Sequence, residues 1–292
     1  ETTLRQNFNN FNVIQSVYKN VDQHGIRSNI LTPISLPTSG QRPVIARVYG
    51  GGLFRGDSIY ADWFPTWLLQ LSEAHAAVIV SPNYRFLAEA NVAQFLKDMH
   101  EFWSWLHSDD FAHPLTPHHV SSISLPGQIE SSDLDLKRIR LQSAISQHKR
   151  GPELYARDSE NSPCRGRLFQ LARLDQPDTK LPRGGLVIMH GVDDGMVVPL
   201  ASERFVEKAR ATMQGRQGGK TIVLSLRPGD HGFDVNSSLE DEWLKEALKT
   251  AVERSVEIVS WGITRVFVQS CPQLASPVFS RHAYDICIGV IF

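Results

Sequence analysis

Cysteine, surplus charge and long apolar runs are all scarce in this chain. It has 3 cysteines among 292 residues, an odd number without metal-ligand spacing, which excludes a disulfide framework and favours a reducing compartment. Its 30 basic and 31 acidic side chains leave a formal net charge of -1, which provides no attraction for nucleic acid or an anionic membrane. No uninterrupted apolar run reaches the roughly 18 residues of a membrane-spanning helix. We therefore expect no nucleic-acid or membrane partner.

Signals for export, metals and nucleotides are missing as well. The opening "ETTLRQNFNNFNVIQ" lacks the basic-then-apolar order of a secretory signal, which predicts a cytoplasmic protein. The histidines at 113, 118 and 119 lie in a proline-rich stretch without a partnering carboxylate spacing, so we expect a solvated loop and no metal. The segment "GRQGGKT" misses the Walker spacing because Gln214 stands where a glycine is required. The sequence thus predicts neither a metal nor a cofactor.

Hydrophobic periodicity indicates strands that alternate with helices. Apolar and polar residues alternate from Asn12 to Ile34 around His24-Gly25, which predicts an antiparallel hairpin. Further strands are expected at 44–48, 76–85, 184–191 and 220–229, and helices at 62–75, 91–108, 199–213 and 238–259. This alternation predicts an α/β protein with a mostly parallel sheet and helices on both faces.

The regular pattern is interrupted twice. Residues 107–183 are rich in turn formers and lack clean periodicity, so we interpret them as an irregular region, either cap-like or shortened by deletion. The last segment, 258–292, resembles nothing upstream and is expected to be an atypical tail. We therefore predict one domain over 12–257.

Three successive glycines follow the first expected parallel strand, in "VYGGGLFRGD". Without side chains, Gly50, Gly51 and Gly52 let a ligand oxygen approach backbone N–H groups, so the loop suits an anion. A phosphate and the oxyanion of acyl transfer are the two candidates. The phosphate fingerprint fits poorly, because Gly50, Gly52 and Gly56 miss its last spacing by one residue.

An acid and a histidine follow the two late strands. Asp193 and Asp194 come directly after "VIMHG", and His231 lies in "PGDHGFD" after the next strand. This is the chain order of a Ser, Asp, His triad on an open sheet.

Together, "RVYGGGLFRGD", "VIVSPNYRFLAEA", "DMHEFWSWL", "HGVDDGMVVP" and "GDHGFD" resemble the esterase/lipase branch of the α/β-hydrolase fold, over 12–141 and 183–257. The resemblance implies that Gly50, Gly51 and Gly52 form an oxyanion loop, with Asp194 as the acid and His231 as the base. Asp194 is preferred to Asp193 because HG-x-x-D is the family spacing.

The chain departs from that family at two places. Tyr49 stands where relatives have a histidine ahead of the glycines, and the nucleophile elbow G-x-S-x-G is absent. Ser143 is nearest to the expected elbow, but Gln142 and Ile145 are too bulky for its tight turn, and Cys164 is a weaker alternative. We therefore expect a fold truncated in the middle, without the elbow, its helix and one strand, and with unpaired strand edges.

Three functions remain open at this point. The resemblance implies a carboxylic-ester hydrolase by descent that takes a small-molecule ester. Several such relatives act in microbial secondary metabolism, so a role in secondary-metabolite biosynthesis is part of this expectation. With no clear nucleophile, we expect weak or no activity. The alternatives are a non-catalytic binding or accessory protein on the same fold, and the product of a disrupted gene. The oligomeric state is not predicted.

Overall fold

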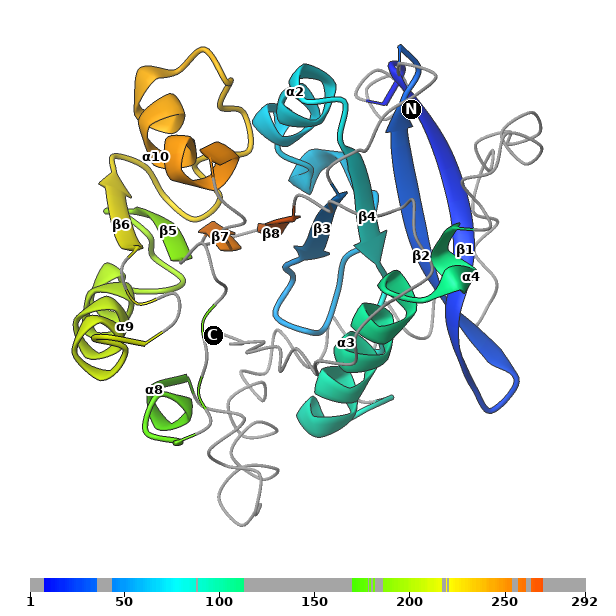
Figure 1. Cartoon of the computed structure of the whole chain (residues 1–292), viewed down its shortest axis with the longest axis horizontal. Coiled ribbons are helices and arrows are strands. Elements are labelled where there is room, and N and C mark those ends of the chain that lie inside the picture. Colours follow the sequence, from blue (N-terminus) through cyan, green and yellow to red (C-terminus); the bar gives the residue numbers. More distant parts are fainter. Residues whose placement is uncertain are drawn as a thin grey trace.

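A computed structural model describes residues 8–35, 44–87, 89–112, 170–177, 179, 181, 186–216, 219, 221–253, 257–260 and 264–269. Within them lies one sheet of eight strands in the order β1-β2-β4-β3-β8-β7-β5-β6. The strands are β1 (Phe11–Val21), β2 (His24–Pro33), β3 (Val44–Tyr49), β4 (Val78–Pro82), β5 (Leu186–Gly191), β6 (Ile222–Arg227), β7 (Glu257–Ser260) and β8 (Thr264–Gln269). Figure 1 shows them side by side across the molecule.

The sheet is mixed, so the expectation of a mostly parallel sheet needs correction. The pairs β3/β4, β5/β6 and β5/β7 are parallel, whereas β1/β2, β2/β4, β3/β8 and β7/β8 are antiparallel. Following these pairings across the sheet, β2 and β8 run against the other strands. The pairs β1/β2 and β7/β8 are hairpins of consecutive strands, and short hairpins join antiparallel neighbours. The strands β3, β4, β5 and β6 nevertheless share one direction.

The hairpin of β7 and β8 lies between β3 and β5. β8 pairs with β3 from Val44↔Gln269 to Tyr49↔Thr264, and β7 pairs with β5 from Leu186↔Glu257 to Met189↔Ser260. The expected unpaired edges are therefore wrong for β3 and β5, because residues from the tail satisfy them. The sheet also extends to Gln269, beyond the expected domain end at 257.

Helices cover both faces of the sheet, as expected. They are α2 (Thr66–Ala74), α3 (Val92–Leu106), α4 (Asp109–Ala112), α8 (Gln170–Arg173), α9 (Pro199–Thr212) and α10 (Glu242–Glu253), with a short 3-10 turn at Ala61–Trp63. Figure 1 shows α2 and α10 on one side of the strands, and α3, α8 and α9 on the other.

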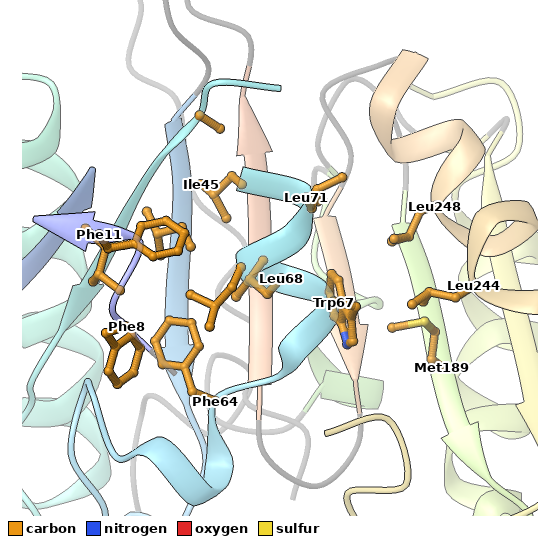
Figure 2. Packing of buried hydrophobic residues seen from close by; sticks show 14 of the residues in the cluster. Phe8, Phe11, Ile45, Phe64, Trp67, Leu68, Leu71, Met189, Leu244 and Leu248 are labelled. Carbon is orange, nitrogen blue, oxygen red and sulfur yellow. The ribbon is translucent and has the colours of Figure 1, made fainter. Parts of the chain in front are cut away.

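Alternate residues of β5 pack on opposite faces of the sheet. On one face Val187 and Met189 pack with Leu244 of α10 and Trp67 of α2, as Figure 2 shows in part. On the other face Ile188 and its neighbours pack against α9. This alternation is the period of two that a strand imposes, and burial on both faces explains why β5 reads as a continuous apolar run.

Three local expectations differ from the structure. The first hairpin turns at Asp22 and Gln23, which both have positive φ, two residues before the expected His24-Gly25. The helix expected over 62–75 is split, because Pro65 precedes the first turn of α2. The last expected helix ends at Glu253, and its final residues belong to β7.

Several candidates lie outside the described residues. They are Ser143, Cys164 and the histidines at 113, 118 and 119, together with most of the irregular region 107–183. None of the described helices combines the length and apolar character needed to cross a membrane.

Candidate functional site

Three sequence-predicted elements of the site follow strands that point the same way. The glycine loop follows β3, Asp194 follows β5 and His231 follows β6. Because β3, β5 and β6 run in one direction, their carboxyl ends lie at the same edge of the sheet. Ligands of open α/β sheets bind outside this edge, so the order of strands brings the candidate residues to one side of the protein.

The glycine loop adopts backbone conformations that side chains would oppose. Gly51 has φ +107° and Gly52 has φ +63°. A Cβ on Gly51 would lie 2.0 Å from the carbonyl oxygen of Arg55, whose N–H bonds back to the Gly51 carbonyl at 3.3 Å. Gly51 is therefore required for both its backbone angle and the tight approach of the loop. A loop of this shape has few side chains to shield its amides from a ligand.

Arg47 supports the segment after the glycines from inside the sheet. Its side chain is fully buried, and its guanidinium donates to the carbonyls of Ser58 at 2.9 Å and Trp63 at 2.8 Å. It also stacks over the ring of Phe64, with 4.1 Å to the centroid. Burial lowers the pKa of Arg47 to about 9. The charged residue within the apolar "VIARVY" strand is the sequence signal that would have pointed to this role.

Tyr84 holds the start of the glycine loop. Its hydroxyl donates to the carbonyl oxygens of Tyr49 at 2.8 Å and Gly50 at 3.1 Å. The Tyr49 and Tyr84 rings stack with centroids 4.5 Å apart, and a Cβ on Gly56 would come within 2.8 Å of the Tyr49 ring. Tyr49, which stands where the resemblance would put a loop-ordering histidine, is therefore held by its stacking on Tyr84.

Asp194 and His231 are in hydrogen-bond contact. His231 Nδ1 lies 3.0 Å from Asp194 Oδ2 and 3.2 Å from Oδ1. The carboxylate side chain is fully buried, whereas the imidazole is 22% exposed. The expected contact is thus present, and it involves Asp194, as the HG-x-x-D spacing indicates. A carboxylate in this position favours the tautomer with the proton on Nδ1, which leaves Nε2 as the basic nitrogen.

Backbone amides keep the Asp194 carboxylate ionised. Burial raises its pKa, but hydrogen bonds from the N–H of Val197 at 2.8 Å, from His231 and from the N–H of Met196 at 2.9 Å outweigh burial. The net pKa lies below the usual value for an aspartate. Asp194 is therefore a fixed negative charge beside His231 at neutral pH.

Two further carboxylates connect the loop after β5, which carries Asp194 (the acid loop), with the loop after β6, which carries His231 (the histidine loop). Asp193 Oδ2 accepts from the N–H of Gly229 at 3.1 Å, and Asp230 Oδ1 accepts from the N–H of Gly195 at 3.0 Å. Each loop thus sends a carboxylate to the backbone of the other. Hydrogen bonds from the amides of Gly195 and His231 lower the pKa of Asp230. Asp230 was not predicted from the sequence, although its position between Gly229 and His231 was an available signal.

The backbones of the two loops also meet closely. A Cβ on Gly191 would lie 2.3 Å from the carbonyl oxygen of Gly229, and the N–H of Asp193 donates to the same oxygen at 3.0 Å. The glycine of HG-x-x-D is therefore required by this contact between β5 and the histidine loop. Among the described residues, no three histidine, cysteine, aspartate or glutamate side chains form a group that could hold a metal ion.

Known proteins resemble this chain over most of its length. No protein-family model matches it. It is 24% identical over 297 residues to Probable carboxylesterase M8 of Phoma sp. (strain ATCC 20986 / MF5453), which covers 78% of this chain and 91% of that protein. The structure of Thermogutta terrifontis esterase 2 phosphonylated by sarin matches with a TM-score of 0.50 and 18% identity, covering 82% of this chain and 93% of the esterase. The fold is α/β-hydrolase-like.

A second structure of the same esterase, phosphoramylated by tabun, matches with a TM-score of 0.49 and 19% identity, over 83% of this chain and 93% of the esterase. The candidate chemistry is therefore argued from the residues at the edge of the sheet.

Proposed function

We propose that this protein is a carboxylic-ester hydrolase by descent, with His231 as the base, Asp194 as the acid and the loop at 50–52 as the oxyanion site. The observation that carries the proposal is the contact between His231 Nδ1 and Asp194 Oδ2 at 3.0 Å. It stands on an α/β-hydrolase-like fold whose similar proteins include a probable carboxylesterase and an esterase. The substrate would be a small-molecule ester, and a role in secondary-metabolite biosynthesis is part of the proposal.

The two parts of the site have separate chemical roles. His231 would accept a proton through Nε2 from the attacking hydroxyl and then return it to the leaving alcohol. Asp194 would hold the ring and stabilise the imidazolium that forms in between. The amides of the glycine loop would stabilise the negative charge on the tetrahedral carbonyl oxygen, a contribution of roughly 10²–10³ in kcat for one donor.

The nucleophile is the weak point of the proposed enzyme. The sequence has no G-x-S-x-G, and Ser143 lies outside the described residues. Triad-deleted hydrolases keep roughly 10³–10⁴ of rate enhancement over water through binding and oxyanion stabilisation. We therefore propose that the chain cleaves esters weakly. The missing elbow also favours a second function, that of a non-catalytic binding protein on the same fold.

Ester turnover and active-site labelling together test these proposals. The purified chain and His231→Ala are assayed with short p-nitrophenyl esters and with a fluorophosphonate probe. Weak turnover that His231→Ala abolishes, without labelling, supports the hydrolase with a lost nucleophile. Turnover equal to that of His231→Ala, combined with saturable binding of an uncleaved ester analogue, supports the binding protein. Ordinary enzyme rates with stoichiometric labelling of Ser143 would show that the nucleophile is intact.

A restored enzyme provides a second test. Inserting a G-x-S-x-G segment with its following helix after residue 141 should raise turnover by orders of magnitude, because the base and the oxyanion loop would gain a positioned hydroxyl. His231→Ala in the restored protein should abolish that gain. A restored chain that folds, labels with fluorophosphonate and yet turns over independently of His231 would contradict the assigned base.

A further inference from the structure

A second imidazole lies against the proposed acid. His190, the last residue but one of β5, is completely buried. Its Nε2 lies 3.2 Å from Asp194 Oδ2, the same oxygen that is 3.0 Å from His231 Nδ1. Asp194 therefore lies between two histidines, one buried and one partly exposed. The acid and base roles discussed above make no use of the buried one.

The hydrogen bonds of His190 fit one neutral tautomer. Nε2 is 2.8 Å from the carbonyl oxygen of Val197, which can only accept, so Nε2 carries a proton. Nδ1 is 2.7 Å from the hydroxyl of Ser202, a buried residue of α9. A hydroxyl that donates to Nδ1 leaves the ring neutral, with its single proton on Nε2.

The loop after β5 is folded around this imidazole. The N–H of Val197 donates to Asp194 Oδ1 at 2.8 Å, while the carbonyl of Val197 accepts from His190. The carboxylate and the imidazole are thus tied to the same peptide segment. HG-x-x-D spacing places His190 four residues before Asp194, and the turn at Gly191 brings the two side chains together.

We propose that His190 is a positioning residue for the acid–base pair. Its Nε2–H donates to the Val197 carbonyl, and Nε2 lies 3.2 Å from Asp194 Oδ2, so the ring restricts the orientation in which the carboxylate accepts the Nδ1 proton of His231. Ser202 sets the tautomer that makes this possible. The catalytic consequence rests on the proposed function, but the geometry and its test do not depend on ester turnover.

The tautomer of His231 is the quantity through which this arrangement would affect catalysis. In a serine-type triad, replacing the orienting residue so that the histidine takes the wrong tautomer lowers kcat by roughly 10⁴-fold. A buried residue that only fills space would affect stability without changing the tautomer of a histidine across the carboxylate. The tautomer therefore separates positioning from packing.

Nitrogen NMR of protein labelled with 15N-histidine measures both tautomers directly at neutral pH. We expect His231 to be protonated at Nδ1 and His190 at Nε2 alone. His190→Leu should convert His231 into a mixture of tautomers, whereas His190→Gln, which keeps an N–H near the Nε2 position, should largely restore the Nδ1 form. Ile188→Val, a change at a buried residue of the same strand, is the matched control and should leave His231 unchanged.

The outcomes distinguish this inference from the proposed function. A wild-type His231 protonated at Nε2 would overturn both. A correct wild-type tautomer that survives His190→Leu would overturn the positioning role alone, as would a wild-type His190 that carries a proton on Nδ1. If His190→Leu does not fold, Ser202→Ala replaces it: a mixed tautomer at His190 with altered His231 signals supports the inference, and unchanged signals at both rings overturn it.

Discussion

The glycine loop and the loops that carry Asp194 and His231 lie at the same edge of the sheet but are held in different ways. The glycine loop depends on groups behind it, the buried guanidinium of Arg47 and the hydroxyl of Tyr84. The acid and histidine loops instead hold each other, through Asp193 to Gly229 and Asp230 to Gly195. Internal support makes the first loop sensitive to core mutations, whereas the second pair should respond to changes at the surface between the loops.

The largest effect is expected from removing the internal support. Arg47→Met leaves the carbonyls of Ser58 and Trp63 without their charged donor. At roughly 1.5 kcal/mol for each of these hydrogen bonds, the free energy of unfolding should fall by about 3 kcal/mol. Chemical denaturation measures the loss. Ile45→Val, on the same strand, is the control and should cost only about 1 kcal/mol. Equal losses for the two variants would show that Arg47 does not support the loop.

Two glycine substitutions should separate the loops. Alanine at Gly51 would place its Cβ 2.0 Å from the Arg55 carbonyl, and alanine at Gly191 would place it 2.3 Å from the Gly229 carbonyl. Each overpacked contact should cost about 2 kcal/mol in the free energy of unfolding. Only Gly191→Ala should disturb His231, because it separates the acid loop from the histidine loop. Imidazole NMR checks this, and a disturbed His231 in Gly51→Ala would mean that the two regions are coupled.

A smaller effect should follow loss of one hydroxyl. Tyr84→Phe keeps the ring stack on Tyr49 and removes the bonds to the carbonyls of Tyr49 and Gly50, at a cost of about 1 kcal/mol. Tyr18→Phe is a matched control, since the Tyr18 hydroxyl bonds the carbonyl of Asn83 at 2.7 Å. Both variants should lose similar stability by denaturation. Only Tyr84→Phe should shift the amide NMR signals of Gly51 and Gly52, and an equal shift in Tyr18→Phe would argue against a specific role.

The sequence predicted the parts of the fold that local pattern determines. Apolar runs marked β3, β4 and β5, because strands covered on both faces have no polar side. The β7 segment was assigned to the preceding helix, since its short apolar run fits either period. Insertion of the hairpin between β3 and β5 is a pairing between residues far apart in the chain, which local periodicity does not contain.

The candidate site likewise contains residues that local sequence motifs predict and residues that they do not. Asp194 and His231 were predictable because short motifs at the ends of strands carry them. His190, Asp230 and Arg47 act through contacts between loops or through buried hydrogen bonds, and their partners include backbone groups of neighbouring loops. Since every residue has a carbonyl and nearly every residue an amide, the sequence does not reveal which of these groups meets a given side chain.

The smallest expected effect concerns acid stability, because at Asp194 burial and hydrogen bonding oppose each other. The pKa of Asp194 is lowered in the folded protein, so near its ordinary value of about 3.9 the unfolded chain binds more protons than the folded one. Stability from this carboxylate is therefore fully present above that pH and is lost as the pH falls through the lower folded pKa.

Urea denaturation at stepped pH values should show wild type losing its advantage over Asp194→Asn in that acid range. Ile188→Val keeps the carboxylate, so its difference from wild type should stay constant. A stability difference between wild type and Asp194→Asn that also stays constant would mean that the amides of Met196 and Val197 and the ring of His231 do not favour the ionised carboxylate. The loop of Asp194 would then lack the electrostatic support that distinguishes it from the glycine loop.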